Sequence, residues 1–358
     1  MHLQSLGNTQ VSREDKQRYS KTMSFHDLPA TTDDLLLSGL ETRDLVRYAR
    51  VSPTTYSKVQ SYYLRAFSIE KHLSPYFTSQ EVHRFRMLQG STGMLITGLS
   101  AIRFFQRQGL SPDIELELYV EHHFTLDIGR WFISVGYEYV SLRLLPIDFK
   151  RAYFEASTYI RPSNAFPRRA HPRFVFRHRH RDTVIIMATV LGSAMEPILN
   201  YPATCVMNII TFDAAVAFFP NATFVHNISL IMDYGGPNQQ HTIDRYKSLG
   251  WTMTRTSNIQ EFLVPFRWVG DNVCWTIPLS KTGLSGYDVK GNSWLQVFSL
   301  YRNSIMYSLV VSYRLRFTYT QARLTLLDVA NKVLENQDSF SDKDVEFIQT
   351  IVKYYGRM

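Results

Sequence analysis

Three carboxylates alternate with aliphatic side chains between residues 113 and 118 of this sequence. Asp113, Glu115 and Glu117 recur at every second position, and because a strand has a period of two, the pattern predicts a strand with all three on one face. Neighbours in such a row are roughly 7 Å apart and can share a divalent cation, whereas the outer pair, roughly 13 Å apart, cannot. The alternative is an edge strand with a solvated acidic face; an arginine would also offset the repulsion.

A strand, a turn and a helix precede this acidic strand. Met94–Ile96 is apolar and predicts a short strand, Gly98 and Ser100 predict a turn, and Ala101–Gln108 predicts a helix. This order indicates an α/β core in which the turn and the acidic strand belong to one sheet layer.

The stretch Met94–Pro220 resembles the nucleotidyltransferase fold, and more closely a fungal family with that fold. In the fold, a Gly-Ser turn holds nucleotide phosphates and an acid-x-acid pair on the next strand binds magnesium. The family carries a GST-A turn, a D-L-D-L-Y-V strand and an S-T-x-V-M-N segment. The counterparts here are Gly98-Leu99-Ser100-Ala101, Glu115-Leu116-Glu117-Leu118-Tyr119-Val120 and Ala203-Thr204-Cys205-Val206-Met207-Asn208. The resemblance implies that Gly98 and Ser100 contact a nucleoside triphosphate and that Glu115 and Glu117 bind magnesium.

Three departures from the family pattern argue against catalysis. Leu99 replaces a serine of the turn, which removes a hydroxyl, and glutamates replace both aspartates, which lengthens each ligand arm. Two-metal nucleotidyl transfer normally uses a third carboxylate. The strand that should supply it, Val184–Met187, has no acid, and Asp182 just before it is the only substitute, although it fits a turn equally well. The pattern therefore favours a degenerate site.

Residues 25–62 predict three short helices, with Ser52-Pro53 as the cap and first turn of the last one. The segment resembles an F-box, whose pattern is Leu-Pro, a leucine-rich helix and an Asp-Leu helix ending in Val-Ser. The matching residues are Leu28, Pro29, Leu40, Arg43, Asp44, Leu45, Val51 and Ser52, and Tyr56 falls where an aromatic residue is usual. Gly39 and Thr31–Asp34 depart from the pattern.

A three-helix segment of about forty residues is marginally stable alone. F-boxes bind the Skp-type adaptor of a cullin-RING ubiquitin ligase, so the resemblance implies such a partner and an unidentified protein substrate. The implied adaptor-binding residues are Leu28, Pro29, Leu40, Leu45 and Val51. The alternative is a small helical cap packed on the α/β domain.

The expected fold class is α+β, with a helical C-terminus. We predict a flexible N-terminus at 1–24, the F-box-like module at 25–62, a nucleotidyltransferase-like mixed-sheet domain at 63–225, and an α/β extension of the same body at 226–358. Near the end, Ser341 begins a capping box and an apolar stripe follows, which predicts a terminal core helix.

The composition fits a globular intracellular protein. The chain has 358 residues, of which 45% are hydrophobic, and can bury a substantial core. Cys205 and Cys274 are the only cysteines, which excludes a disulfide framework. The N-terminal residues lack the apolar core of a signal peptide, and the longest apolar run, Val184–Met195, is short. We expect a soluble protein of the cytoplasm or nucleus with no membrane partner.

The net charge of +8 permits an anionic partner. Seven arginines and three histidines lie between Arg161 and Arg181. The strands Arg173–His178 and Thr183–Thr189 predict a hairpin whose basic tip is solvated. Because the aromatic interleaving of a stacking platform is missing, nucleic acid is not the favoured partner.

Two functions follow from these patterns. The favoured one is an F-box-type substrate receptor built on an inactive nucleotidyltransferase-like domain. The alternative is an active magnesium-dependent nucleotidyltransferase that acts on a protein, a nucleic acid or a small molecule.

Overall fold

The computed structural model of the chain describes residues 30–110, 114–142, 145–159, 171–191, 193–233, 239–264, 266–280, 293–298, 303–306, 308–310 and 319–321. The chain divides into two compact units with a boundary between Ala66 and Phe67. The predicted N-terminal segment 1–24, Leu28, Pro29, Asp113 and the predicted helix after Ser341 lie outside the described residues.

The first unit contains the three helices expected for residues 25–62. They are α2 (Ala30–Ser38), α3 (Thr42–Ala49) and α4 (Pro53–Ala66). Ser52 caps α4, because its hydroxyl accepts a 3.1 Å hydrogen bond from the backbone N–H of Thr55. The core of this helical module consists of four buried side chains, Leu37, Leu45, Val59 and Tyr62.

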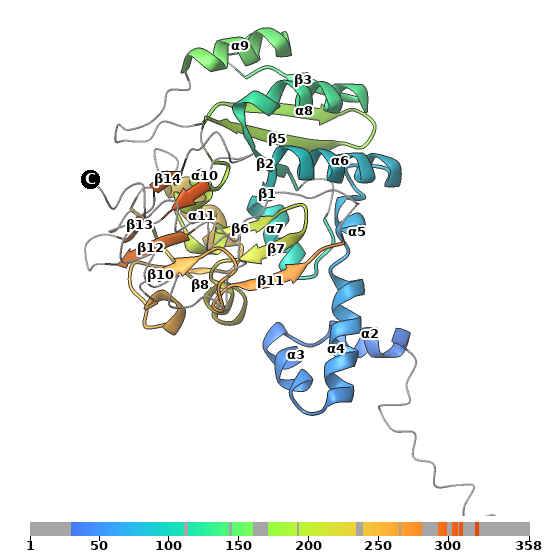
Figure 1. Cartoon of the computed structure of the whole chain (residues 1–358), viewed down its shortest axis with the longest axis vertical. Helices are drawn as coiled ribbons and strands as arrows, with labels where there is room; N and C mark the ends of the chain where they lie inside the picture. The colour runs from blue at the N-terminus through green and yellow to red at the C-terminus, as the bar shows by residue number, and fades with distance from the viewer. Residues whose placement is uncertain are drawn as a thin grey trace, which may run out of the picture. The chain divides into compact units, whose positions relative to one another are not determined.

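The second unit is built on a mixed eight-stranded sheet, which agrees with the α+β class (Figure 1). Its strands run in the order β11-β7-β6-β1-β2-β5-β4-β3. They are β1 (Leu95–Thr97), β2 (Leu116–Glu121), β3 (Tyr137–Val140), β4 (Arg173–His178), β5 (Thr183–Val190), β6 (Asn208–Ile210), β7 (Ala214–Ala217) and β11 (Trp275–Pro278).

Helices and smaller sheets complete this unit. The α-helices are α5 (Ile69–Leu73), α6 (Ser79–Thr92), α7 (Gly98–Phe105), α8 (His122–Ser134), α9 (Phe149–Tyr159), α10 (Met195–Leu199) and α11 (Gln239–Ser248). Short turns of helix are η2 (Thr204–Val206), η3 (Ala222–His226) and η4 (Gln260–Phe262). The remaining strands are β8 (Ile228–Leu230), β9 (Thr252–Thr254), β10 (Phe266–Trp268), β12 (Ser293–Phe298), β13 (Asn303–Met306), β14 (Ser308–Val310) and β15 (Tyr319–Gln321).

The centre of the large sheet combines both strand orientations. β1 pairs antiparallel with β2, with Thr97 opposite Glu117. β2 pairs parallel with β5, with Glu117 opposite Ile186. β5 then pairs antiparallel with β4, as the predicted hairpin required.

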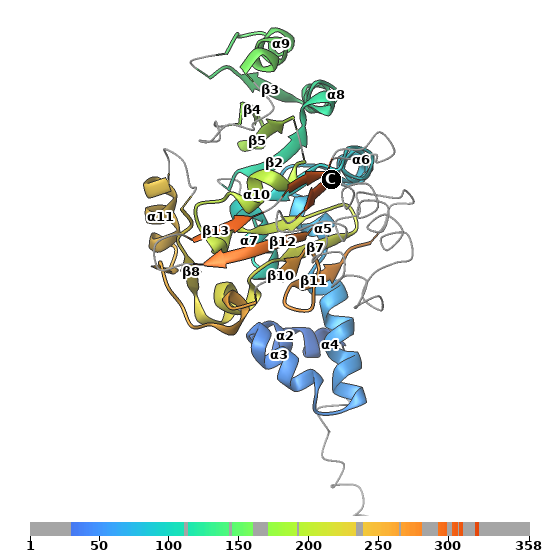
Figure 2. The same cartoon turned by 60° about the vertical axis from the view of Figure 1, so that its left-hand side comes forward.

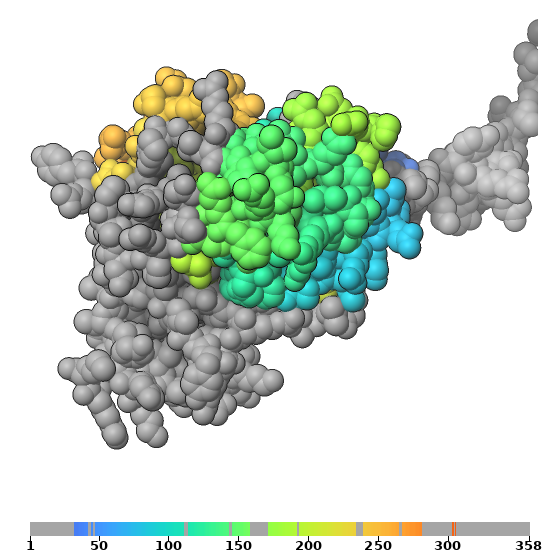
Figure 3. Space-filling model, turned by 90° about the horizontal axis from the view of Figure 1, so that it is seen from above, coloured from blue at the N-terminus to red at the C-terminus, as the bar shows by residue number. Residues whose placement is uncertain are grey.

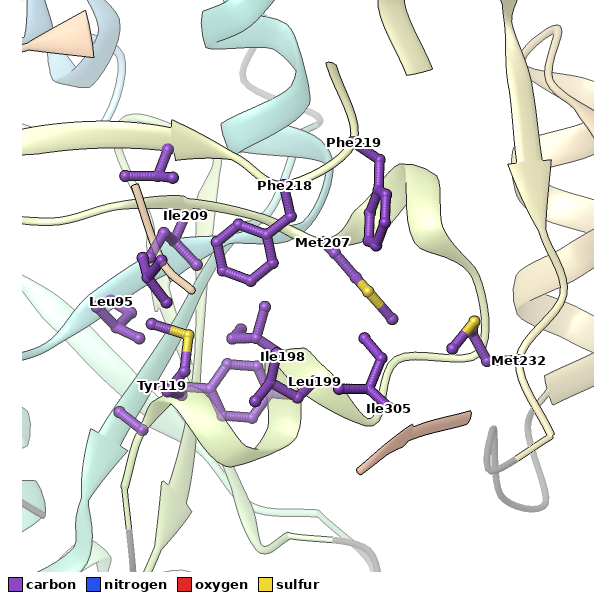
Figure 4. Close-up of a cluster of buried hydrophobic side chains, with 14 of the residues drawn as sticks. Leu95, Tyr119, Ile198, Leu199, Met207, Ile209, Phe218, Phe219, Met232 and Ile305 are labelled. Carbon is purple, nitrogen blue, oxygen red and sulfur yellow. The ribbon is translucent and has the colours of Figure 1, made fainter. Parts of the chain in front are cut away.

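The two faces of the sheet are covered by different elements, with α6 and α8 on one side and α11 on the other (Figure 2). On the α8 side, Phe132 packs on Phe176 of β4 with ring centroids 5.3 Å apart. On the opposite side, Tyr119 of β2 joins a cluster that includes Ile198 and Leu199 of α10 (Figure 4). Along β2 the odd-numbered residues Glu117 and Tyr119 therefore face α10 and α11, while Leu116 and Leu118 face the helices on the other side.

Local sequence signals explain where α6 begins and ends. Thr78 and Glu81 form a capping box, in which the Glu81 carboxylate accepts a 2.7 Å hydrogen bond from the Thr78 N–H. Gly93 follows the helix with a φ of +69°, a conformation that glycine adopts at low cost. On the surface seen in Figure 3, the helices α8 and α9 (green) lie side by side.

A buried arginine joins α6 to the turn between β6 and β7. The Arg86 guanidinium donates a 2.9 Å hydrogen bond to the Thr211 carbonyl and further bonds to the Phe212 carbonyl and the Gln89 side chain. Burial lowers the pKa of Arg86 to about 10, so the group stays protonated at neutral pH.

The apolar segment Ala214–Phe219 suits a helix by pattern, but Ala214–Ala217 forms the strand β7, which pairs with both β6 and β11. The segment is apolar on both faces because both faces of β7 are covered, so its sequence lacks the alternation of a half-exposed strand. Residues Gln239–Ser248, by contrast, form the helix α11.

Among the described residues, none of the helices is both long enough and apolar enough to cross a membrane.

Candidate functional site

The structure brings the predicted Gly98 turn and the predicted acidic strand together. Gly98 begins α7 with a φ of +69° and lies directly against Glu117 of β2. A Cβ built on Gly98 would overlap the carboxylate oxygen Oε1 of Glu117. Only a residue without a side chain leaves room for the carboxylate here, and only glycine adopts this φ freely. The contact between β1, α7 and β2 thus forms the centre of the candidate site.

Glu115, the second predicted metal ligand, borders an open depression of about 530 Å³ beside α11. The other residues that line it are His241, Asp244, Arg245 and Ser248, which all come from α11. The depression is polar and carries charges of both signs, so it lacks the apolar walls of a typical small-molecule pocket.

Arginines from two separate elements act on the Glu117 carboxylate. Burial raises the pKa of Glu117 above its usual value, whereas the positive charges of Arg173 and Arg245 lower it and the charge of Glu115 raises it further. Arg173 begins β4 and Arg245 lies in α11, so β2 receives positive charge from both its sheet and the helix that faces it.

A short chain of hydroxyl groups lies next to Glu117. The Tyr201 hydroxyl is 3.2 Å from Thr97 Oγ1, which itself donates a 3.0 Å hydrogen bond to the Asn208 carbonyl. Burial raises the pKa of Tyr119, and hydrogen bonds to Tyr201 and Arg173 oppose that rise. Burial raises the pKa of Tyr201 as well, so both tyrosines stay neutral at physiological pH and act as hydrogen-bonding groups.

Ser100, the predicted second phosphate contact, points away from this centre. Its side chain is fully buried in α7, and Oγ lies 3.1 Å from Nε2 of His72. Burial lowers the pKa of His72 to about 3, so the imidazole is neutral and forms a structural hydrogen bond. The backbone of the turn, rather than the Ser100 hydroxyl, is the part that borders Glu117.

Asp182, the predicted third metal ligand, lies in the turn between β4 and β5 with a φ of +50°. The residue of β5 opposite Glu117 is Ile186, so four residues of extended chain, roughly 13 Å, separate Asp182 from the level of Glu117. Among the described residues, no group of three or more His, Cys, Asp or Glu side chains is placed to hold a metal ion. The structure brings Glu115 and Glu117 together, but not with Asp182.

The basic tip of this hairpin is occupied by ion pairs. Arg179 Nε donates a 2.8 Å hydrogen bond to Glu138, and Arg181 Nη2 lies 2.9 Å from the Glu81 carboxylate. Arg181 also donates a 2.6 Å hydrogen bond to the Tyr76 carbonyl. These partners belong to β3, to the start of α6 and to the turn that precedes α6, so the two arginines hold the hairpin tip against its neighbours.

The predicted adaptor-binding residues of the helical module occupy different environments. Leu45 is only 1% exposed and belongs to the core, and Leu40 is half-buried against that core. Val51, in the turn before α4, is 72% exposed. Further exposed apolar side chains in the module are Leu35, Leu36, Tyr56 and Leu64.

Sequence reasoning missed Arg173 and Arg245 as parts of the site. Arg173 stood out only as one member of an arginine-rich stretch, and Arg245 as one residue of a predicted helix. They lie 56 and 128 residues after Glu117 in the sequence, and nothing in their local pattern links them to it. The available signal was that the carboxylates at 113, 115 and 117 repel one another, which predicts a positive charge nearby without saying which residue supplies it.

Comparisons of this chain with protein-family models, with curated proteins and with solved structures find no match.

Proposed function

We propose that this chain is an F-box-type substrate receptor that carries a degenerate nucleotidyltransferase-like domain. The helical module would bind a Skp-type adaptor, and the α/β unit would present a surface to a protein substrate. The support for the first part is the resemblance of residues 28–56 to the F-box pattern together with the apolar side chains that the module exposes.

The observation that carries the proposal is that the helical module buries few of its apolar side chains and exposes several others. Its core holds four fully buried hydrophobic side chains, while Leu35, Val51 and Leu64 are 75%, 72% and 81% exposed. Exposed apolar side chains that gather into one patch mark a surface that a partner covers, and the proposal takes these three to belong to such a patch. Burying one such side chain contributes about 1.5–3 kcal/mol, which corresponds to roughly 10- to 100-fold in affinity.

The exposed residues allow a sharper test than the buried Leu45. We expect Val51→Glu and Leu64→Glu each to weaken binding of a purified Skp-type adaptor by about tenfold or more in titration calorimetry. Gln60→Glu is the matched control, because it adds the same charge to an exposed position of α4. Helical content by circular dichroism should be unchanged in all three variants.

The proposal fails if the parent protein does not bind the adaptor, or if both glutamate variants bind it as the parent does. Leu45→Asp is unsuitable as a binding test, since charging a core residue is expected to unfold the module.

A second candidate function, active magnesium-dependent nucleotidyl transfer, is favoured by one observation. The Gly98 turn and Glu117 meet directly, as phosphate and metal binding in the resembling fold would require. This function predicts binding of a nucleoside triphosphate in the presence of magnesium, abolished by EDTA and by Glu117→Ala. Calorimetry that detects no such binding in the parent protein would exclude it.

A further inference from the structure

A histidine at the start of α8 joins two hydroxyl groups that come from different elements. Nε2 of His122 lies 2.7 Å from Oγ of Ser157 in α9, and Nδ1 lies 3.0 Å from Oγ1 of Thr189 in β5. Both distances are within hydrogen-bonding range. Thr189 Oγ1 lies a further 2.8 Å from Oγ1 of Thr125 in α8. The imidazole is thus held at both ring nitrogens.

The contact between α8 and α9 also fixes the plane of this imidazole (Figure 3). The His122 ring stacks on Tyr153 of α9, with ring centroids 4.6 Å apart and an interplanar angle of 13°. His122 is only 9% exposed, and burial lowers the pKa of its imidazole below the usual 6.5. The ring is therefore neutral at neutral pH, and one of its nitrogens is free to accept a proton.

The exposure of Ser157 on α9 leaves its hydroxyl open to molecules from solvent. His72 and Ser100 form a similar pair, with 3.1 Å between Nε2 and Oγ, but Ser100 is fully buried and no substrate can reach it. An accessible hydroxyl beside a neutral imidazole that a third group orients is the arrangement of an activated serine nucleophile.

The single hydrogen of the Ser157 hydroxyl has two acceptors within reach. They are His122 Nε2 at 2.7 Å and the Tyr153 carbonyl at 3.0 Å. The imidazole nitrogen is the closer of the two, and it is a stronger base than an amide carbonyl. When Ser157 donates to Nε2, the imidazole hydrogen is on Nδ1 and is donated to Thr189.

We infer that Ser157 is a nucleophile and His122 its general base, for carboxylic esters with a good leaving group. Ser157 Oγ forms a bond to the ester carbonyl carbon while its proton moves to Nε2. The bond between that carbon and the leaving oxygen breaks, and the leaving group takes the proton from Nε2. Water, deprotonated by the same nitrogen, then releases the acid and restores the serine. Thr189 is a positioning residue, because it holds Nδ1 and does not touch the ester.

This activity goes beyond the proposed receptor function and uses none of the residues assigned to it. The test treats the full-length protein at pH 8 with an alkyl fluorophosphonate, whose phosphorus bonds to an activated serine as fluoride leaves. Peptide mass spectrometry identifies each modified serine and follows its rate of labelling.

Ser134 is the internal control, because it is an exposed serine of α8 whose hydroxyl donates a 2.7 Å hydrogen bond to the Trp131 carbonyl. We expect Ser157 to be labelled at least about 100-fold faster than Ser134, which is the lower end of what a general base contributes. His122→Gln should remove this advantage. His123→Gln is the matched control, since it changes the exposed neighbouring histidine and should leave the rate unchanged.

The role of Thr189 has its own readout. Thr189→Val should slow the labelling of Ser157, and the conservative Thr189→Ser should restore it. The hydrogen of the His122 imidazole, located by ¹⁵N NMR, should be on Nδ1 in the parent and in Thr189→Ser.

Two results would overturn the inference. One is labelling of Ser157 in the parent protein that is no faster than that of Ser134, a comparison that needs no variant to fold. The other is a folded His122→Gln variant in which Ser157 is labelled at the parent rate. If His122→Gln does not fold, the ratio of Ser157 to Ser134 labelling in the parent decides.

Discussion

Replacing Gly98 by alanine should destabilise the second unit through two separable effects. Gly98 has a φ of +69°, which costs an L-residue about 1–2 kcal/mol. The added Cβ would also overlap Glu117 Oε1, so the carboxylate must move away from its position against Gly98. Forcing a side chain out of its packed position costs about 1–3 kcal/mol. The sum predicts a loss of about 2–5 kcal/mol in the free energy of unfolding.

A double-mutant cycle separates the backbone effect from the steric effect. In a Glu117→Ala background the carboxylate is absent, so Gly98→Ala should cost only the backbone contribution of about 1–2 kcal/mol. The difference between the two backgrounds, about 1–3 kcal/mol, is the coupling energy between the two residues. Urea denaturation followed by tryptophan fluorescence measures each corner of the cycle.

Gly109→Ala is the control for this cycle. A Cβ at Gly109 meets nothing within 4 Å, so its effect should stay within about 0.5 kcal/mol. Equal costs of Gly98→Ala in both backgrounds would refute the close contact with Glu117. A cost near zero in the parent would refute the left-handed conformation as well.

Three further predictions concern buried groups. Burial raises the pKa of Glu261 to about 7, above its value of 4.5 in an unfolded chain. The contribution of Glu261 to stability is therefore present below pH 4.5 and is lost as the pH rises through 7. The urea midpoint should be lower at pH 8 than at pH 5, and Glu261→Gln should reduce this difference. The buried Arg267 Nε donates a 2.6 Å hydrogen bond to Asp271, so Arg267→Met should cost about 3–5 kcal/mol in chemical denaturation, and a cost below about 1 kcal/mol would contradict burial of the pair. Burial raises the pKa of both Cys205 and Cys274 to about 12, so a disulfide reagent at pH 8 should label them quickly only in urea, and rapid labelling of the native protein would contradict this.

The core of the sheet was predictable from sequence because its signals are local. The alternation of Glu115 to Leu118 indicated the face that each residue of β2 occupies, and the strand ends of the β4–β5 hairpin were predicted to within one residue. Gly98 was recognisable as a turn residue whose neighbours begin a helix. Each of these signals lies within a few residues of the feature it predicts.

The features that the sequence did not predict depend on contacts between residues that are distant in the chain. β7 looks helical or extended by pattern alone, and only its pairing with β6 and β11 decides between them. The burial of Leu45 depends on how three helices close around four side chains. Arg245 becomes part of the site only because α11 covers the acidic end of β2, an arrangement that no local spacing encodes.

The hydrogen bonds of Arg86 bear on how the chain folds during synthesis. The carbonyl groups that accept from Arg86 lie 125 and 126 residues later in the sequence. Until the turn between β6 and β7 leaves the ribosome, the guanidinium has no partners there, and burying it would leave a charge uncompensated. We therefore expect α6 to stay undocked in nascent chains that end before Thr211. Arg86 therefore delays the docking of α6 on the sheet until β6 and the turn that follows it have been synthesised.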